Sequence, residues 1–95
     1  MWLVHRERIE AFADEFKDSE APLSAWVQAM EAGKFRHFVE LKKALGSADY
    51  VRPHVVFNIA GNKYRLIALV NFELGVVSVE RVLTHAQYDR GRWRR

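Results

Sequence analysis

Between residues 55 and 89 the chain combines β-branched and aromatic residues with two tight-turn signals. The first signal is Gly61-Asn62 and the second is Leu74-Gly75. β-rich runs separated by such short turns pair as antiparallel hairpins. The pattern therefore predicts a three-stranded antiparallel meander, with strands at about residues 54–60, 63–72 and 76–84.

Helical periodicity comes before these strands. Apolar residues spaced i, i+3, i+4 and i+7 form one stripe over residues 9–16 and a second over residues 23–30, which predicts two amphipathic helices. A less regular stripe at 35–45 predicts a short helix, and 46–49 predicts a loop. Residues 1–4 are apolar and suit an edge strand. Helices followed by antiparallel strands define an α+β fold, with the N-terminal helices packed on one face of a small twisted antiparallel sheet.

Size and composition limit the class of protein. Ninety-five residues suit one domain spanning 1–95, with residues 90–95 as a basic, flexible tail. The chain has no cysteine and no apolar run near the roughly 20 residues that cross a bilayer, so we expect a cytoplasmic protein without membrane contact. Its four histidines have no metal-ligand spacing, and we expect neither metal nor cofactor.

Charge is distributed unevenly along the chain. Residues 1–48 hold seven Lys and Arg against eight Asp and Glu, a balance of −1, whereas residues 49–95 hold eight against four, a balance of +4. The half that carries the predicted sheet is therefore the electropositive half. A surface of this kind attracts a polyanion such as RNA before any specific contact forms.

The period-2 alternation of a strand predicts which side chains share a face. In the middle strand, every second residue from Tyr64 to Phe72 is apolar, so this set is expected against the helices. Arg65 is then expected on the opposite, open face as an exposed residue. In the third strand Val77, Val79, Arg81 and Leu83 fall on one face by the same rule, which would let Arg81 join Arg65.

Two motifs in this region resemble a known family. The run FNI-x-GN-x-YRL covers residues 57–66, and the ending TH-x-x-YD covers residues 84–89. Together they resemble the HigB-type toxins of bacterial type II toxin–antitoxin modules, within the RelE-like group of messenger-RNA interferases. The resemblance implies a RelE-like fold and an endoribonuclease that cuts mRNA on the 70S ribosome and inhibits translation. It also implies a cognate HigA-like helix-turn-helix antitoxin.

RNA is cut without a metal when its own 2′-hydroxyl attacks the adjacent phosphorus, which calls for proton transfer and for positive charge at the phosphate. His85 is the best candidate for proton transfer, because imidazole titrates nearest neutrality. Lys63, Arg65 and Arg81 are candidates for binding phosphate. Tyr88 is suited to stack on a base or to assist proton transfer.

The resemblance sharpens these assignments. Arg65 matches the Arg of the YRL motif, and His85 and Tyr88 match the TH-x-x-Y ending, so these three are expected to be catalytic. Asn58 and Asn62 fall on the FNI and GN motifs and join the expected RNA contacts. In the family, lysines often precede the YRL strand, whereas this chain has Asn58 and a histidine there.

Other interpretations of the same residues remain open. Asn62 follows a glycine, which is also typical of a turn-forming residue. Tyr88 is as well suited to pack on the sheet as to stack on a base. Trp93 lies among arginines and either stacks on RNA or belongs to a disordered tail. The whole chain also fits a non-catalytic RNA-binding module, or a protein-interaction module with a basic sheet face that receives an acidic partner.

Overall fold

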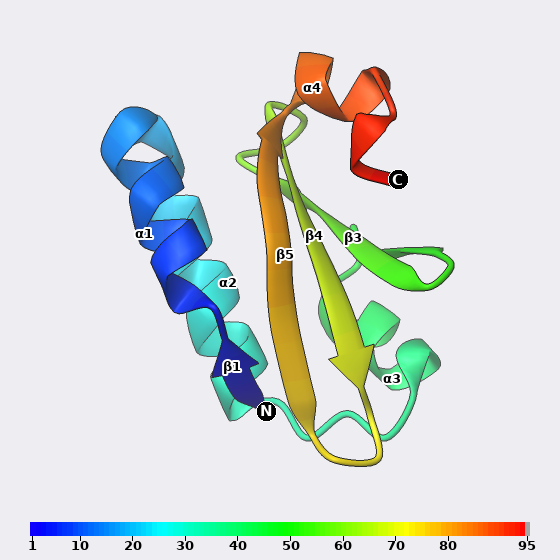
Figure 1. Ribbon diagram of the computed structural model, residues 1–95. Helices are drawn as coiled ribbons and strands as arrows, with labels where there is room; N and C mark the ends of the chain where they lie inside the picture. Colours follow the sequence, from blue (N-terminus) through cyan, green and yellow to red (C-terminus); the bar gives the residue numbers. More distant parts are fainter. Residues whose placement is uncertain (95) are drawn as a thin grey trace.

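The computed structural model describes residues 1–94, and Arg95, the last residue of the expected basic tail, lies outside the described residues (Figure 1). None of the helices formed by residues 1–94 is long and apolar enough to span a bilayer. The elements, with η marking short 3₁₀ turns, are β1 (Trp2–Val4), α1 (Arg6–Glu15), η1 (Lys17–Ser19), α2 (Glu20–Ala32), α3 (Phe38–Ala44), β2 (Asp49–Val51), β3 (His54–Ile59), β4 (Tyr64–Asn71), β5 (Val76–Thr84), α4 (His85–Asp89) and η2 (Arg92–Arg94).

The strands form one five-stranded sheet in the order β1-β5-β4-β3-β2. Its centre is the predicted meander, in which β3 pairs with β4 and β4 with β5, both antiparallel. The expectation of a purely antiparallel sheet was wrong, because β1 runs parallel to β5. The expected loop at 46–49 was also too long, since Asp49 already opens β2, a short outer strand on β3.

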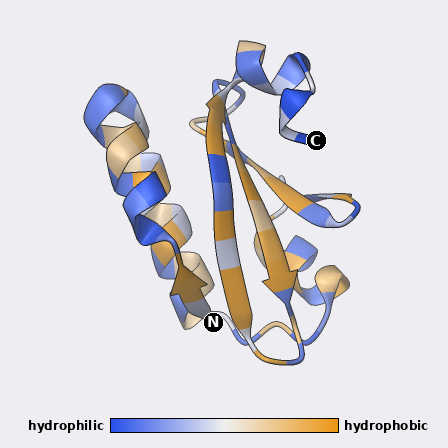
Figure 2. Ribbon diagram, in the orientation of Figure 1, coloured by the Kyte–Doolittle hydropathy of each residue, from blue (hydrophilic) through white to orange (hydrophobic). Residues whose placement is uncertain are grey.

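Helices α1, α2 and α3 pack on one face of this sheet and build the main core with it, which confirms the predicted α+β fold (Figures 1 and 2). The middle strand contributes its even-numbered apolar residues, with Tyr64, Leu66 and Ala68 all buried there. Met30 from α2 and Leu41 from α3 are fully enclosed in the main core. The opposite face of the sheet is the open face.

A β-bulge interrupts the alternation in β5. Ile67 pairs with Arg81, but the next residue of β4 pairs with Val79, which leaves Glu80 without a partner in β4. The extra residue shifts the alternation of side chains between the two halves of the strand. Figure 2 shows a hydrophilic band across β5. The prediction that Val77, Val79, Arg81 and Leu83 share a face was therefore wrong, because the two valines are buried in the main core and Arg81 lies on the open face.

Residues 90–94 fold back over the open face. Trp93 is buried with Val56 and Ile67 in a second apolar cluster, and Leu83 and Tyr88 pack against it. The Trp93 indole N–H donates a hydrogen bond to the carbonyl oxygen of Tyr88 at 3.1 Å. These contacts place residues 90–94 against the sheet, with Trp93 buried, whereas the flexibility of this basic segment stays a prediction.

Candidate active site at the end of the sheet

The candidate site forms where β5 ends and α4 begins. Thr84 is the N-cap of α4, and it exchanges hydrogen bonds with Gln87: the Gln87 N–H donates to Thr84 Oγ1 at 3.2 Å and the Thr84 N–H donates to Gln87 Oε1 at 3.0 Å. This reciprocal pair is a capping box. The sequence interpretation placed His85 at the end of a strand and missed this T-x-x-Q signal, which predicts a helix beginning at His85.

His85 is the first residue of α4 and about half exposed. Its backbone N–H donates to the Lys63 carbonyl oxygen at 3.0 Å, which docks α4 on the turn between β3 and β4. The imidazole Nδ1 lies 2.8 Å from Asp89 Oδ2, one helical turn away. A carboxylate at Nδ1 orients the ring and favours the tautomer whose Nε2 accepts a proton. Asp89 was not among the predicted site residues, although its i, i+4 spacing from His85 indicates such a pair.

Arg65 lies on the open face of β4, opposite Asn58 of β3. The sequence interpretation expected an exposed side chain, but Arg65 is only 8% exposed. Its guanidinium donates to the carbonyl oxygens of Asn62 and Tyr64 and to Asn62 Oδ1, at 3.2, 3.1 and 2.5 Å. These acceptors are neutral, and within residues 1–94 no carboxylate forms a salt bridge with Arg65. The buried charge is therefore held in place without being neutralised.

Tyr88 lies between Arg65 and Trp93. The guanidinium carbon of Arg65 lies 5.5 Å from the centre of the Tyr88 ring, within the range of a cation–π contact. Trp93 stacks on the Tyr88 ring with 5.2 Å between centroids and an interplanar angle of 15°, and the His54 ring meets Trp93 edge-on. Trp93 was considered as a residue that stacks on RNA, and His54 was noted on the strand before the YRL strand, but neither was among the predicted site residues. The contact between them depends on the fold of residues 90–94, which sequence periodicity does not reveal.

The other predicted residues lie at different distances from this corner. Asn62 holds Arg65 from the β3–β4 turn, so its position serves both the turn and the site. Asn58 is exposed beside Arg65 on the open face. Arg81 is exposed on β5 two residues before Leu83, the partner of Arg65. Asn58, Asn62, Arg65, Arg81, His85 and Tyr88 thus belong to one surface.

Lys63 is directed differently. Its ammonium binds the Asp18 carboxylate in η1, on the helix side of the sheet, and the Tyr64 hydroxyl donates to the same carboxylate at 2.6 Å. Hydrogen bonds from Lys63 and Tyr64 lower the pKa of Asp18, and the same bonds raise the pKa of Lys63 and of Tyr64. Neither Lys63 nor Tyr64 is therefore suited to accept a proton near neutral pH.

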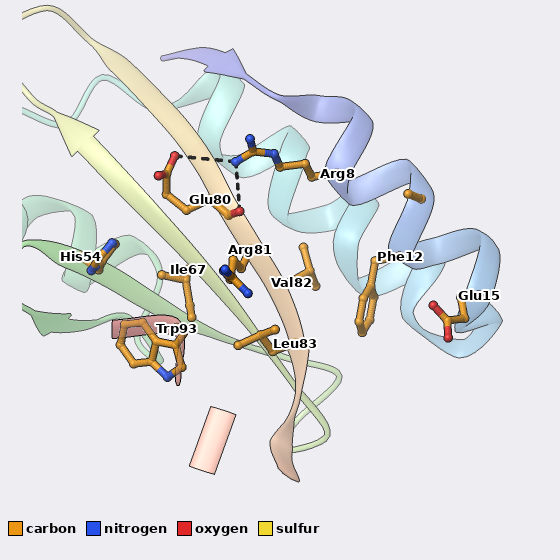
Figure 3. Close-up of a pocket in the computed structure, with 11 residues that line it drawn as sticks. Arg8, Phe12, Glu15, His54, Ile67, Glu80, Arg81, Val82, Leu83 and Trp93 are labelled. Carbon is orange, nitrogen blue, oxygen red and sulfur yellow. Dashed lines mark hydrogen bonds and ion pairs between the residues drawn. The ribbon is translucent and has the colours of Figure 1, made fainter. Parts of the chain in front are cut away.

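A groove of about 720 Å³ runs beside this surface, between α1 and β5 (Figure 3). Arg8 of α1 crosses it and donates to the carbonyl oxygens of Val79 and Glu80, each at 3.0 Å. The groove extends over Arg81 to Trp93 and so joins the α1 side of β5 to the open face. Among residues 1–94, no three His, Asp or Glu side chains gather into a potential metal site.

The arrangement provides an oriented imidazole, a buried guanidinium that lacks an anionic partner, and further arginines on the surrounding surface. Such a set can bind a phosphate and move a proton beside it. Amide groups from Asn58 and Asn62 add neutral donors and acceptors at the same corner. This chemistry fits a phosphodiester substrate.

Comparison with known proteins points the same way. A family model described as "HigB_toxin, RelE-like toxic component of a toxin-antitoxin system" matches residues 19–91. The mRNA interferase toxin HigB of Escherichia coli strain K12 is 30% identical over 92 residues, which cover 94% of this chain and 88% of that protein. The mRNA interferases HigB of Escherichia coli O157:H7 and Shigella flexneri match with the same identity and coverage. These matches confirm the resemblance seen in the two motifs, and the chain belongs to the HigB family, the RelE-like toxic components of toxin–antitoxin systems.

Proposed function

We propose that this toxin is an endoribonuclease that cuts messenger RNA on the translating ribosome, by attack of the RNA 2′-hydroxyl on the adjacent phosphorus without a metal ion. Membership in the HigB family and the names of its relatives as mRNA interferases support the enzyme class. The observation that carries the mechanism is the His85–Asp89 pair on α4, the same helix whose Tyr88 ring lies 5.5 Å from the buried, unneutralised guanidinium of Arg65.

In the proposed reaction the 2′-oxygen bonds to phosphorus while the bond from phosphorus to the 5′-oxygen breaks. The products are a 2′,3′-cyclic phosphate and a 5′-hydroxyl. The 2′-hydroxyl loses one proton and the leaving 5′-oxygen gains one, so the reaction is balanced. His85 exchanges one of these two protons at Nε2, and Asp89 orients its ring from Nδ1. Arg65 donates to the non-bridging phosphate oxygens, whose negative charge grows in the transition state. Tyr88 holds the Arg65 guanidinium through its ring.

Two partners follow from this proposal. Messenger RNA is the substrate, presented in the decoding region of the 70S ribosome, and Asn58, Asn62 and Arg81 contact it around the cleaved bond. A HigA-like helix-turn-helix antitoxin neutralises the toxin in the cytoplasm. Lys63 contributes to RNA binding only if its ammonium leaves Asp18.

Expression of the chain alone in bacteria tests the proposal. We expect growth to stop and a reporter message to be cut inside its translated region. An identical message with its start codon removed serves as the control, because a ribosome-dependent enzyme spares an untranslated message. Cleavage of both messages would refute ribosome dependence. Arrested or normal growth with intact messages, at confirmed soluble expression, would refute the nuclease and favour a non-catalytic RNA-binding module.

A further inference from the structure

A small pocket beside the candidate site is surrounded by arginines. It has a volume of about 180 Å³ and lies between β5, α4 and η2. Its lining residues are Arg81, Leu83, Gln87, Arg90, Arg92 and Trp93. The lining contains three cationic side chains and no acidic one.

These guanidinium groups lack anionic partners. The arginines that form salt bridges within residues 1–94 are Arg6, Arg8 and Arg36, each with a glutamate. Arg81, Arg90 and Arg92 are exposed and form no salt bridge there. Three like charges around one hollow repel each other, and a bound anion removes that repulsion.

The pocket is held in shape by buried contacts rather than by the arginines themselves. Arg90 is the C-cap of α4, and Arg92 precedes Trp93, which is only 6% exposed and bonded to the Tyr88 carbonyl. The backbone that carries both arginines is therefore fixed at each end. Preorganised donors bind with less loss of conformational entropy than donors on a mobile tail.

From these observations we propose that Arg81, Arg90 and Arg92 form a phosphate subsite for the RNA strand next to the cleaved bond. The proposal rests on the proposed function, because it takes RNA as the substrate. Its position supports RNA: α4 begins with His85, and Arg90 follows about 7.5 Å further along the helix axis, a separation that suits a neighbouring phosphate of the same strand. Arginine forks are also matched to phosphate oxygens.

The salt dependence of RNA binding tests this subsite. The probe is a short single-stranded RNA in which every 2′-hydroxyl is methylated, so that it cannot be cut. Fluorescence anisotropy gives its Kd over a series of KCl concentrations. Each phosphate contact to a single strand contributes about 0.7 to the slope of log K against log salt. The double substitution Arg90→Gln and Arg92→Gln is expected to reduce the slope by about 1.4 and to weaken binding at low salt.

The matched control replaces Arg6 and Arg36 with glutamine. This control also removes two positive charges, but Arg6 is paired with Glu31 and Arg36 with Glu40, away from the pocket. It is expected to leave the slope near the wild-type value, and both double variants are expected to melt near the wild-type temperature.

Four results would overturn the subsite: no binding of the probe by the wild type, an unchanged slope in the Arg90/Arg92 variant, an equal loss in the control, or tighter binding of a polyglutamate peptide than of RNA. The last result would assign the pocket to an acidic protein partner. Because the probe cannot be cleaved, a failure of the nuclease proposal appears separately, as binding without cleavage of unmodified message.

Discussion

At the level of single residues, the environment of Arg65 is the most informative. Burying a charge costs free energy unless a counter-charge or hydrogen bonds compensate for it. Here Asn62 and the backbone supply neutral oxygens, and the aromatic ring of Tyr88 supplies a weak attraction. The protein therefore maintains a cation that is desolvated in advance of binding. A guanidinium in this state interacts more strongly with a phosphate than one that is fully hydrated.

Replacing Arg65 with lysine keeps the charge but removes the planar fork. We expect single-turnover cleavage on programmed ribosomes to slow by roughly 10²-fold, the usual effect of losing a transition-state donor. We also expect a lower melting temperature, because the hydrogen bonds to Asn62 are lost as well. Arg52→Lys, at an exposed turn, is the control for the same chemical change. If the Arg65→Lys variant cleaved at the wild-type rate, Arg65 would not act as a transition-state donor.

Substitution of His85 tests its role in proton transfer. His85→Gln is expected to lower the cleavage rate by roughly 10²-fold or more while ribosome binding changes little, because glutamine cannot exchange a proton at Nε2. Asp89→Asn should lower it by a smaller factor, since the ring keeps its proton-transfer group but loses its orienting carboxylate. The exposed His37→Gln is the matched control. A rate within a few-fold of wild type for His85→Gln would exclude general acid–base catalysis by this group.

At the level of elements, the segment from α4 to η2 combines two roles. It brings His85 and Tyr88 to the end of the sheet, and it covers the apolar middle of the open face with Trp93. Without that cover, Val56 and Ile67 would be exposed to solvent beside a cationic surface. The open face therefore has a small second core at its centre and a cationic surface at its margin.

Trp93→Ala tests this element. Truncating a buried aromatic side chain typically costs about 3–5 kcal/mol of unfolding free energy, and we expect a loss in this range from denaturant titration. Trp93→Phe should recover part of it, because it keeps an aromatic ring on Tyr88. Trp2→Ala is the control, since Trp2 is 73% exposed. If Trp93→Ala unfolds at the same denaturant concentration as Trp2→Ala, the segment is not anchored as described.

At the level of the whole molecule, one polar cluster joins the helix layer to the sheet. Asp18 lies between α1 and α2 and binds Lys63 and Tyr64 at the start of β4. The pKa of Asp18 is lowered below its ordinary value of 3.8, so its contribution to stability is present above that value and is lost as pH falls through the folded-state pKa. The pKa of Lys63 and that of Tyr64 are raised above 10.5 and 10.0, so their contributions are lost as pH rises through the folded values.

We therefore expect the melting temperature to fall at both ends of the pH range, with a plateau at about pH 5 to 9 between them. Asp18→Asn should lower the plateau and flatten both flanks, because the asparagine cannot ionise. Asp14→Asn, in an exposed pair with Lys17 at 3.8 Å, is the control and should leave the profile nearly unchanged. Equal pH profiles for the wild type and Asp18→Asn would contradict this account.

Local periodicity predicted much of the fold. Helical stripes located α1 and α2, two turns located the meander, and alternation in β4 placed Leu66 in the main core. It failed at Glu80, because a bulge is a property of strand pairing and cannot be detected from one strand alone. The parallel pairing of β1 has the same origin, since β1 and β5 are more than seventy residues apart in sequence.

Several residues of the candidate site were predictable from the sequence, but their environments were not. The two motifs indicated Arg65, His85 and Tyr88, and the structure brings these residues together at one corner. The burial of Arg65 was not predictable, because the Tyr88 ring and the Asn62 side chain that contact its guanidinium lie outside β4. The direction of Lys63 likewise depends on Asp18, a residue forty-five positions earlier in the chain.

Because of its bulge, β5 can lose one residue without changing which side chains face the helices. If Glu80 were deleted, Val79 and Arg81 would become neighbours and strict alternation would return. Val79 and Val82 would still face the helices, and Arg81 would still face outward. Deleting Val82 instead would move Leu83 to the helix side. Deleting the single codon for Glu80 is therefore compatible with the present faces of β5. Deleting the codon for Val82 would invert the faces of the end of the strand that leads into α4.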